Sequence, residues 1–284
     1  MAKDTSLNRK VTLNDKGNLI DFTRPSVMAI LNLTPDSFYA GSRVSGRDMA
    51  LRRTEAFLNE GASFIDIGAY SSRPGAQHIH EDEELKRLIP VVEALAKTFP
   101  EALLSIDTFR SKVAGEAIEA GAHLINDISA GSLDPAMFNT VASLKIPYIM
   151  MHMKGTPQTM QQNPVYEDVT AEVIRYFREK LDVLKQAGVH EVILDPGFGF
   201  AKTVEHNYTL LQHLDHLKCF GLPLLVGVSR KSMITNVLGN KAVDALNGTT
   251  VLHTLALMKG ASILRVHDVK EAAECIKLVQ QTGI

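Results

Sequence analysis

LLSIDTFRSKVAGEAIEAGAHLIND, residues 103–127, contains two short apolar runs on either side of an amphipathic segment. Apolar runs of about four to eight residues are typical of strands that are buried on both faces. The segment between them reaches Gly121, and helices commonly end at a glycine. A strand, a helix and a second strand in this order require parallel strands joined by a right-handed crossover. The stretch therefore predicts a βαβ unit.

The same alternation continues along most of the chain. Apolar runs predict eight strands, near residues 27–32, 64–68, 103–107, 123–127, 147–151, 191–195, 223–228 and 262–266. Amphipathic segments separate these runs, and eight such units close best as a (β/α)₈ barrel of the α/β class. A doubly wound open sheet is the structural alternative. The chain has 284 residues, close to the roughly 250 typical of such a barrel, so we expect one domain over residues 1–284.

A different pattern precedes the first core strand. KVTLNDKGNLIDF, residues 10–22, alternates apolar and polar residues on both sides of Asp15, Lys16 and Gly17. Alternation around a glycine turn predicts a β-hairpin, which we place at residues 8–22. We expect the hairpin to cover the amino-terminal end of the barrel, where water must be excluded but no chemistry takes place.

Composition and charge argue against several classes of function. The formal net charge is −2 and the pI is about 6.6, so no overall field attracts nucleic acid or an anionic membrane. The two cysteines, Cys219 and Cys275, form no CxxC pair, which favours a reducing compartment. The opening residues are polar, and no apolar stretch approaches the roughly 18 residues that span a bilayer. We therefore expect a cytoplasmic protein.

Seven of the apolar runs end on a polar side chain that is able to take part in chemistry. Because the parallel strands of a barrel all end at one face, we expect these side chains to meet where barrel enzymes keep their active sites. The residues are Asn32, Asp107, Asn126, Asp127, His152, Asp195, Lys231, Arg265 and His267. This repetition predicts an enzyme.

Two connections on this face are longer than the about two to six residues usual for such loops. They are TPDSFYAGSRVSG, residues 34–46, and AYSSRPGAQHIHE, residues 69–81. Long, polar loops that contain glycine are candidate lids. Because these two follow adjacent strands, we expect them to close over one site. A tolerated surface insertion is the alternative for either loop alone.

The strand ends are compatible with several reactions. Asp107 and Asp195 suggest a pair of glycosidase acids, but the chain has no tryptophan to serve as a sugar platform. Lys231 suggests a Schiff-base aldolase, because a desolvated lysine is easily activated. Barrels commonly bind phosphate after their last two strands, where this chain has several cations. A phosphorylated substrate is therefore predicted by Ser229, Arg230, Arg265 and His267.

Asp107, Asn126 and Asp195 are expected on the opposite wall of the site. Their side chains offer mostly hydrogen-bond acceptors, and an ionised carboxylate accepts two parallel N–H bonds well. The set suits a planar heterocycle with an amino group beside ring N–H groups, such as a guanine-like or pterin-like edge. For each residue alone, a side chain that caps a loop or helix is the alternative.

Several motifs resemble those of the dihydropteroate synthase family, in order and over essentially the whole chain. They are NLTPDSF (32–38), SSRPGA (71–76), SIDTFR (105–110), INDISAG (125–131), MMHMKGTPQTMQ (150–161), LDPGFGF (194–200), VSRKS (228–232) and RVHD (265–268). The first two are specific to this family and its close pterin-binding relatives. The last two narrow the resemblance to the synthase.

The resemblance implies condensation of 6-hydroxymethyl-7,8-dihydropterin pyrophosphate with p-aminobenzoate, which yields 7,8-dihydropteroate and pyrophosphate. The family's pterin-binding positions are matched by Asp107, Asn126, Asp195 and Lys231. The residues that would sandwich the pterin ring are Ile128, Met153 and Phe200. For these last three, ordinary core packing explains the sequence equally well.

The resemblance also implies a pyrophosphate site and a Mg²⁺ ion. The pyrophosphate positions are matched by Asn32, Arg73, Arg265 and His267. Asn32 matches the metal-contacting position, and Asp36 in the first long loop completes or steers it. A neutral amide is a weak single ligand, which fits Mg²⁺ held largely by phosphate oxygens and water. The catalytic positions are matched by Asp36, Arg73, Lys231, Arg265 and His267.

A third set of residues concerns the second substrate. The p-aminobenzoate positions are matched by Phe38, Ser72, Arg73, Pro74 and Ser232. The dihydropterin stabilises positive charge at its exocyclic methylene, so pyrophosphate is expected to leave before the amine attacks. An arylamine is already neutral near pH 7 and needs placement more than a general base. The family also implies inhibition by sulfonamides and a homodimer that involves residues 245–261, although burial within one chain explains that segment almost as well.

The chain departs from the family's commonest pattern in its two long loops. Where the second loop usually reads GESTRPGA, Tyr70 replaces the glutamate and Ser72 replaces the threonine, which removes a methyl group from the wall around p-aminobenzoate. In the first loop, Ala40 replaces a frequent aspartate. Two rival functions are a corrinoid-linked methyltetrahydrofolate methyltransferase, which needs no pyrophosphate cations, and a non-catalytic pterin-binding homologue, which would lose loop or phosphate residues.

Overall fold

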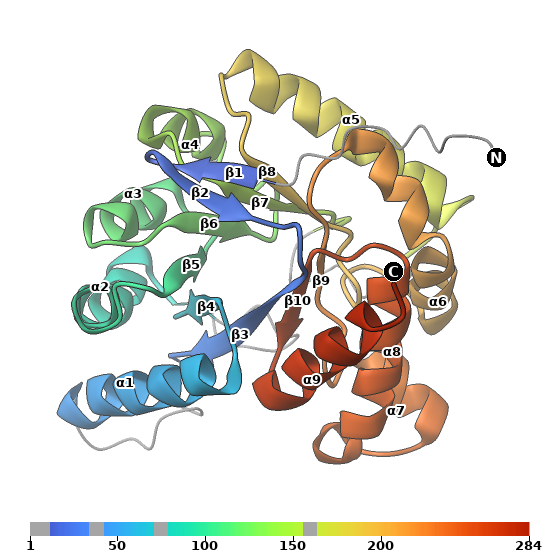
Figure 1. The fold of residues 1–284 in the computed structure, drawn as a ribbon. Helices are drawn as coiled ribbons and strands as arrows, with labels where there is room; N and C mark the ends of the chain where they lie inside the picture. The colour runs from blue at the N-terminus through green and yellow to red at the C-terminus, as the bar shows by residue number, and fades with distance from the viewer. Residues whose placement is uncertain (1–11, 34–42, 71–78, 156–163, 284) are drawn as a thin grey trace.

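The computed structural model describes residues 12–33, 43–70, 79–155 and 164–283. In this part of the chain, eight strands form one parallel sheet in the order β8-β7-β6-β5-β4-β3-β10-β9 (Figure 1). The strands are β3 (Ser26–Asn32), β4 (Phe64–Gly68), β5 (Leu103–Asp107), β6 (Leu124–Asp127), β7 (Tyr148–Met151), β8 (Val192–Asp195), β9 (Leu225–Val226) and β10 (Ile263–Val266). They agree with the predicted strands except at β9, which is shorter than the predicted 223–228.

The first and last strands of this order meet and close the sheet. A parallel bridge joins Leu194 in β8 to Leu224 beside β9, and the Leu194 N–H donates to the Pro223 carbonyl at 2.9 Å. The predicted (β/α)₈ barrel is thereby confirmed. The alternative of a doubly wound open sheet is wrong, because the sheet of such a fold keeps two free edges.

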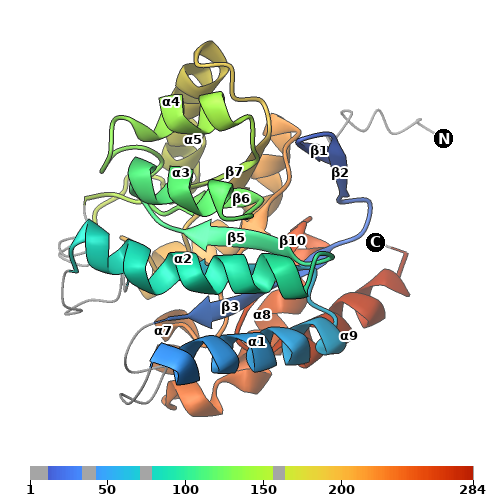
Figure 2. The ribbon, with the colours of Figure 1, turned by 90° about the vertical axis from the view of Figure 1, so that its left-hand side faces the viewer.

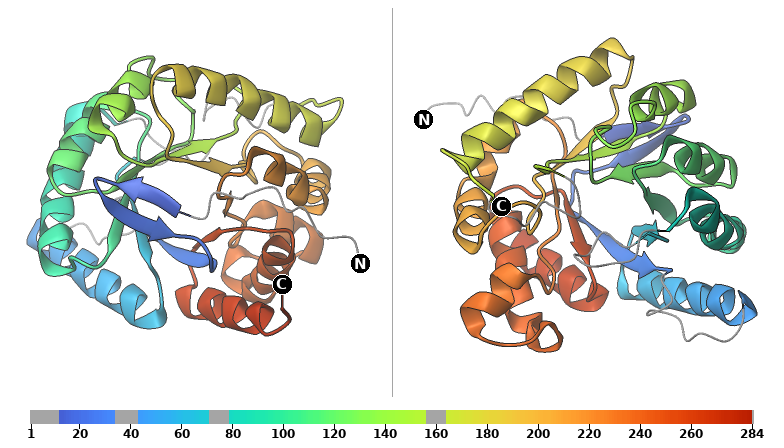
Figure 3. Two further views of the ribbon diagram at one scale, coloured as in Figure 1. Left: turned by 45° about the horizontal axis from the view of Figure 1, so that its top comes forward. Right: turned by 180° about the vertical axis from the view of Figure 1, so that it is seen from behind.

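Helices surround the barrel on its outer side (Figure 3). Their bounds are α1 (Arg43–Glu60), α2 (Glu81–Thr98), α3 (Ser111–Glu119), α4 (Met137–Leu144), α5 (Val169–Gln186), α6 (Val204–Gln212), η2 (Leu214–Phe220), α7 (Ser232–Leu238), η3 (Ala242–Asp244), α8 (Leu246–Met258) and α9 (Val269–Gln280). α1 begins at Arg43, so the last four residues of the loop predicted at 34–46 belong to a helix. None of the helices in the described ranges is long and apolar enough to cross a membrane.

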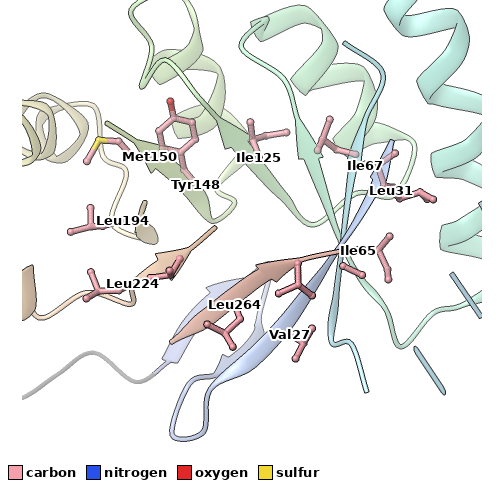
Figure 4. Packing of buried hydrophobic residues seen from close by; sticks show 14 of the residues in the cluster. Val27, Leu31, Ile65, Ile67, Ile125, Tyr148, Met150, Leu194, Leu224 and Leu264 are labelled. Carbon is pink, nitrogen blue, oxygen red and sulfur yellow. The ribbon is translucent and has the colours of Figure 1, made fainter. Parts of the chain in front are cut away.

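Side chains that point outward from the strands form the main apolar cluster beneath the helices. Figure 4 shows part of this cluster, in which Val27, Leu31, Ile65 and Tyr148 are fully or almost fully buried. Because helices cover the outer face and side chains fill the inner one, the strands are apolar on both faces. This is why they are recognisable in the sequence as continuous apolar runs.

The N-terminal hairpin covers one end of the barrel, as predicted. It consists of β1 (Thr12–Asp15) and β2 (Asn18–Asp21), which pair antiparallel around Lys16 and Gly17. Strands β3 and β5 point away from it in Figure 2, so it lies at the amino-terminal end. Residues 8–11 of the predicted hairpin lie outside the described ranges. A second apolar cluster joins hairpin and barrel through Leu13, Ile20, Phe22, Met28, Phe64, Leu124, Ile149, Ile193, Leu225 and Ile263.

Two residues further along the strands, the side chains that point into the barrel become mostly polar. They face the same way as the second cluster because side chains alternate with a period of two along a strand. These residues are Ile30, Asp66, Ser105, Asn126, Met151, Asp195, Gly227 and Arg265. The hairpin packs against the apolar amino-terminal end of the barrel, and the charged side chains lie towards the carboxyl-terminal end.

Candidate active site

Asp66 is fully buried inside the barrel and accepts hydrogen bonds from three other strands. Ser105 Oγ donates to Asp66 Oδ1 at 2.6 Å, and Asn126 Nδ2 donates to Oδ2 at 3.1 Å. Arg265 Nε also donates to Oδ2, at 2.6 Å. Charge-assisted hydrogen bonds of this kind are stronger than neutral ones and define the geometry of the donor. Asp66 therefore orients the side chains of Asn126 and Arg265.

The Arg265 guanidinium also reaches Asp107, at the end of β5. Its Nη2 donates to Asp107 Oδ2 at 2.8 Å. Burial raises the pKa of Asp107 to about 7, the charge of Arg265 limits this rise, and the charge of Asp66 adds to it. Burial alone would lower the pKa of Arg265, but the two carboxylates raise it above its ordinary value. Arg265 is therefore a permanent cation between two acids.

Asp195 and Lys231 contribute a second pair of opposite charges. Burial raises the pKa of Asp195, and the positive charge of Lys231 partly offsets this rise. Burial lowers the pKa of Lys231 to about 8, and the negative charge of Asp195 partly offsets this decrease. Asp195 Oδ1 accepts from the Gly197 N–H at 2.8 Å, and the Lys231 ammonium donates to the Phe198 carbonyl. Lys231 Nζ lies 4.7 Å from the centroid of the Phe200 ring, within range of a cation–π interaction.

An apolar wall lies at the carboxyl ends of the strands. Ile128 and Met153 are buried and Phe200 is partly buried, and the three residues predicted to sandwich a ring belong to one cluster. This cluster is separate from the main one beneath the helices. Its other members, which were not predicted, are Phe109, Met151 and Ala201.

Asn32 lies close to Asp107 across the end of β4. A Cβ atom added to Gly68 would be 3.8 Å from Asn32 Oδ1 and 3.7 Å from Asp107 Oδ2. The glycine therefore leaves the amide and the carboxylate without a side chain between them. His267 is exposed just after β10, and Ser232 is the first residue of α7.

The residues grouped around phosphate in the sequence are divided in the structure. Arg230 donates to both carboxylate oxygens of Asp268, at 2.8 and 2.7 Å, and to two carbonyls of η3, at 2.8 Å each. These contacts within the protein occupy the Arg230 guanidinium. The prediction that Arg230 is a phosphate-binding residue is thereby corrected. The hydroxyl of Ser229 accepts from the His267 N–H at 3.2 Å and so supports the position of His267.

A metal ion would find few ligands in the described ranges. No group of three or more His, Cys, Asp or Glu side chains there is placed to hold one. The Asn32 amide oxygen is a hard donor of the kind that Mg²⁺ takes together with phosphate oxygens and water. The residues present therefore fit an ion that arrives with a phosphorylated substrate better than a cage built by the protein.

Part of the predicted site falls outside the described ranges, namely Asp36, Phe38, Ser72, Arg73 and Pro74. Tyr70, directly before the second of these segments, is described. Its ring packs edge-on against Phe109, with centroids 5.2 Å apart, and the Arg110 guanidinium lies 5.4 Å from its centroid. The replacement for the family's usual glutamate thus packs against residues that follow β5.

Sequence reasoning missed two buried charged residues, Asp66 and Lys202. An acid inside the apolar run FIDIG was the signal for Asp66, and a lysine directly after LDPGFGFA was the signal for Lys202. Lys202 Nζ lies 3.0 Å from Nδ1 of His152, the strand-end histidine without a predicted role. Burial lowers the pKa of Lys202 to about 7 and that of His152 to about 2, so the histidine is neutral.

The chain has close relatives among known proteins. Residues 28–267 match the family of pterin binding enzymes. The dihydropteroate synthase of Escherichia coli strain K12 is 45% identical over 269 residues, which cover 94% of this chain and 95% of that protein. The dihydropteroate synthase of Haemophilus influenzae is 42% identical over 276 residues, which cover 96% of this chain and 99% of that protein. The Yersinia pestis dihydropteroate synthase in complex with a sulfonamide drug has a TM-score of 0.90 and 44% identity, over 96% of this chain and 99% of that one.

Proposed function

The chain belongs to the pterin-binding enzyme family, and we propose that it condenses 6-hydroxymethyl-7,8-dihydropterin pyrophosphate with p-aminobenzoate to 7,8-dihydropteroate and pyrophosphate, a step of folate biosynthesis. One observation carries the proposal. The acceptors Asp107, Asn126 and Asp195 share one barrel mouth with the cations Lys231 and Arg265. The identity to two dihydropteroate synthases and the sulfonamide complex of the Yersinia pestis relative support it, and extend it to sulfonamides as inhibitors.

The pterin edge is recognised mainly through acceptors. One N–H of Asn126 Nδ2 donates to Asp66, which holds the amide in one orientation, and the Asn126 carbonyl oxygen serves as an acceptor for the heterocycle. Asp107 and Asp195 accept the remaining N–H bonds of the amino-pyrimidine edge, and Lys231 donates to the ring acceptors. Ile128, Met153 and Phe200 hold the two faces of the ring, since all three lie in one apolar cluster at the mouth.

The chemical step is a substitution at the exocyclic methylene carbon. Its C–O bond to pyrophosphate breaks first, and the electron pair leaves on pyrophosphate. The lone pair of the arylamine then forms the C–N bond, and the nitrogen releases a proton to solvent. Arg265, His267 and Arg73 bind the departing anion, and such preorganised charges stabilise a transition state in which negative charge develops.

Mg²⁺, when bound, would supply further neutralisation of the pyrophosphate charge. The Asn32 amide would contribute one oxygen to it, and Asp36 would orient this part of the site. p-Aminobenzoate is enclosed by Phe38, Ser72, Arg73 and Pro74, and its carboxylate is bound at Ser232. No general base beside the amine is required, because the attacking nitrogen is neutral near pH 7 and only needs to be held in place.

The active unit is a homodimer that uses α8. Val251, Leu255 and Met258 are 51%, 45% and 49% exposed and follow one another at a spacing of four and three residues, which places them on one helix face. Val237 and Leu238 at the end of α7 are also exposed. Exposed apolar side chains that gather on one face are typical of a protein interface. A single domain over residues 1–284 and a cytoplasmic location remain predictions from the sequence.

A turnover assay tests the proposed reaction. Purified protein, the pterin pyrophosphate, p-aminobenzoate and Mg²⁺ should release pyrophosphate and dihydropteroate in equal amounts, and omission of p-aminobenzoate should abolish dihydropteroate formation. A Lys231→Met variant serves as the matched inactive control. Tight binding of the dihydropterin without turnover would contradict catalysis and favour a pterin-binding protein, whereas lack of pterin binding would contradict the site itself.

A further inference from the structure

Lys202 is buried beneath residues 196–201, which form the first part of the loop from β8 to α6. Its Nζ lies 3.0 Å from His152 Nδ1, 3.0 Å from the Gly197 carbonyl oxygen and 3.1 Å from the Phe200 carbonyl oxygen. The residue is 4% exposed. An ammonium group has three N–H donors and no acceptor, so three surrounding acceptors satisfy it completely. Neutral His152 serves as one of them in the tautomer that carries its proton on Nε2, because Nδ1 then accepts.

These contacts connect two segments that carry the apolar wall of the site. His152 lies between Met151 and Met153, which belong to the same cluster as Phe200. The His152 N–H also donates to the Asp195 carbonyl at 2.9 Å. Lys202 therefore joins the end of β7, which carries the methionines, to the loop that carries Phe200.

The loop has a shape that needs such support. Gly197, Gly199 and Ala201 have φ angles of 70°, 78° and 50°, and Ala201 adopts this left-handed conformation without the freedom of a glycine. At Gly197 the chain passes so close to β7 that an added Cβ would lie 2.1 Å from the His152 carbonyl oxygen. The contacts of the ammonium hold the loop in this tight position.

Two lysines share the carbonyl groups of the loop. Lys202 binds those of Gly197 and Phe200 from the buried side, and Lys231 binds that of Phe198. Lys231 also packs over the Phe200 ring. A displacement of the loop would therefore move both the Phe200 ring and the acceptor that holds Lys231.

We propose that Lys202 is a positioning residue that sets the distance between the Met151–Met153 segment and Phe200, and hence the width of the slot for the pterin ring. It acts through backbone carbonyls and His152 and does not contact the substrate. The identity of the ring rests on the proposed function. The organisation of the loop by Lys202 does not, and it can be measured without any ligand.

The test compares wild-type protein with Lys202→Met, which keeps the length of the side chain and removes the donors. In unliganded protein, hydrogen exchange of the peptide covering residues 195–203 should become at least tenfold faster. The dissociation constant for 6-hydroxymethyl-7,8-dihydropterin, measured by calorimetry on protein that circular dichroism confirms as folded, should rise at least tenfold. Lys185→Met is the matched control, because Lys185 is an exposed lysine on α5, and both quantities should stay within twofold.

Each result has a defined meaning. Unchanged pterin affinity in folded Lys202→Met overturns the proposal, even if the variant is less stable, because a purely structural lysine would affect stability alone. If Lys202→Met does not fold, Lys202→Gln retains part of the donors and should give smaller changes of the same sign; wild-type values would overturn the proposal. If wild-type protein does not bind the dihydropterin, the proposed function fails, and the exchange measurement alone decides whether Lys202 organises the loop.

Discussion

Arg265 Nη2 donates a hydrogen bond of 2.8 Å to Asp107 Oδ2, so the cation proposed for pyrophosphate is paired with an acid proposed for the pterin edge. Asp66 binds the same guanidinium from within the barrel, at 2.6 Å. A pterin that binds Asp107 competes for a carboxylate that Arg265 already uses, while Asp66 keeps the guanidinium in place. The two halves of the site are therefore coupled through one arginine.

Asp66→Asn should disturb this arrangement without a change in side-chain size. Removal of one partner from a buried ion pair typically costs about 3 kcal/mol or more, so the free energy of unfolding in urea should fall by about 3 kcal/mol. Pterin affinity should also fall, because Asn126 and Arg265 lose their common acceptor. Asp182→Asn, an exposed site on α5, is the matched control. Wild-type stability and affinity in Asp66→Asn would contradict the role of Asp66.

Pterin affinity should be highest near pH 7 and fall on both sides. Burial raises the pKa of Asp107 to about 7, so below pH 7 this carboxyl group is protonated in the free protein. It must lose the proton before it can accept a hydrogen bond from a ligand N–H as a carboxylate. Burial lowers the pKa of Lys202 to about 7 and that of Lys231 to about 8, so both ammonium charges are lost as the pH rises through these values. The measurement is the dissociation constant of the phosphate-free dihydropterin from pH 5 to 9, since this ligand brings no phosphate titration of its own.

The Asp107→Asn variant is the control for the acidic limb of that profile. It should bind the dihydropterin more weakly at pH 7.5 and lose the decrease in affinity below pH 7, because an amide does not titrate there. The decrease above pH 8 should remain, since Lys231 is unchanged. An acidic limb that persists in Asp107→Asn would assign it to another group.

Ser72→Thr should strengthen binding of p-aminobenzoate. The resemblance to the family places this residue beside the benzoate ring, and burial of one additional methyl group contributes about 0.8 kcal/mol, or about fourfold in KM. The value of kcat and the affinity for the pterin should stay unchanged. An unchanged KM for p-aminobenzoate would remove residue 72 from the ring's surroundings.

Leu255→Glu should separate the proposed homodimer into monomers. A charge in the middle of the exposed face of α8 would have to be buried in an interface without a partner, which is costly. Sedimentation at several concentrations measures the association. Val183→Glu on α5 is the matched control, because Val183 is 50% exposed and far from α8 along the ring of helices. Equal dimer dissociation constants for Leu255→Glu and Val183→Glu would show that this face of α8 is not the dimer interface.

The order of elements was predictable because it depends on local patterns. Each strand that is buried on both faces leaves an apolar run such as LLSID, and each helix leaves an amphipathic segment. The eightfold repetition then predicts a barrel and places Asp107, Asn126, Asp195 and Lys231 at one face. The main errors, the start of α1 and the length of β9, concern element boundaries, where local signals are weakest.

The partners of these side chains were decided by the tertiary structure. Arg265 and Asp66 are 199 residues apart in the chain and meet only because the barrel closes. The same holds for Asn126, whose amide is oriented by its hydrogen bond to Asp66. It also holds for Arg230, whose guanidinium is bound by Asp268. The sequence by itself determined which residues reach the carboxyl face, through periodicity. Which of them bind one another depends on distances between strands, and these exist only once the sheet has closed.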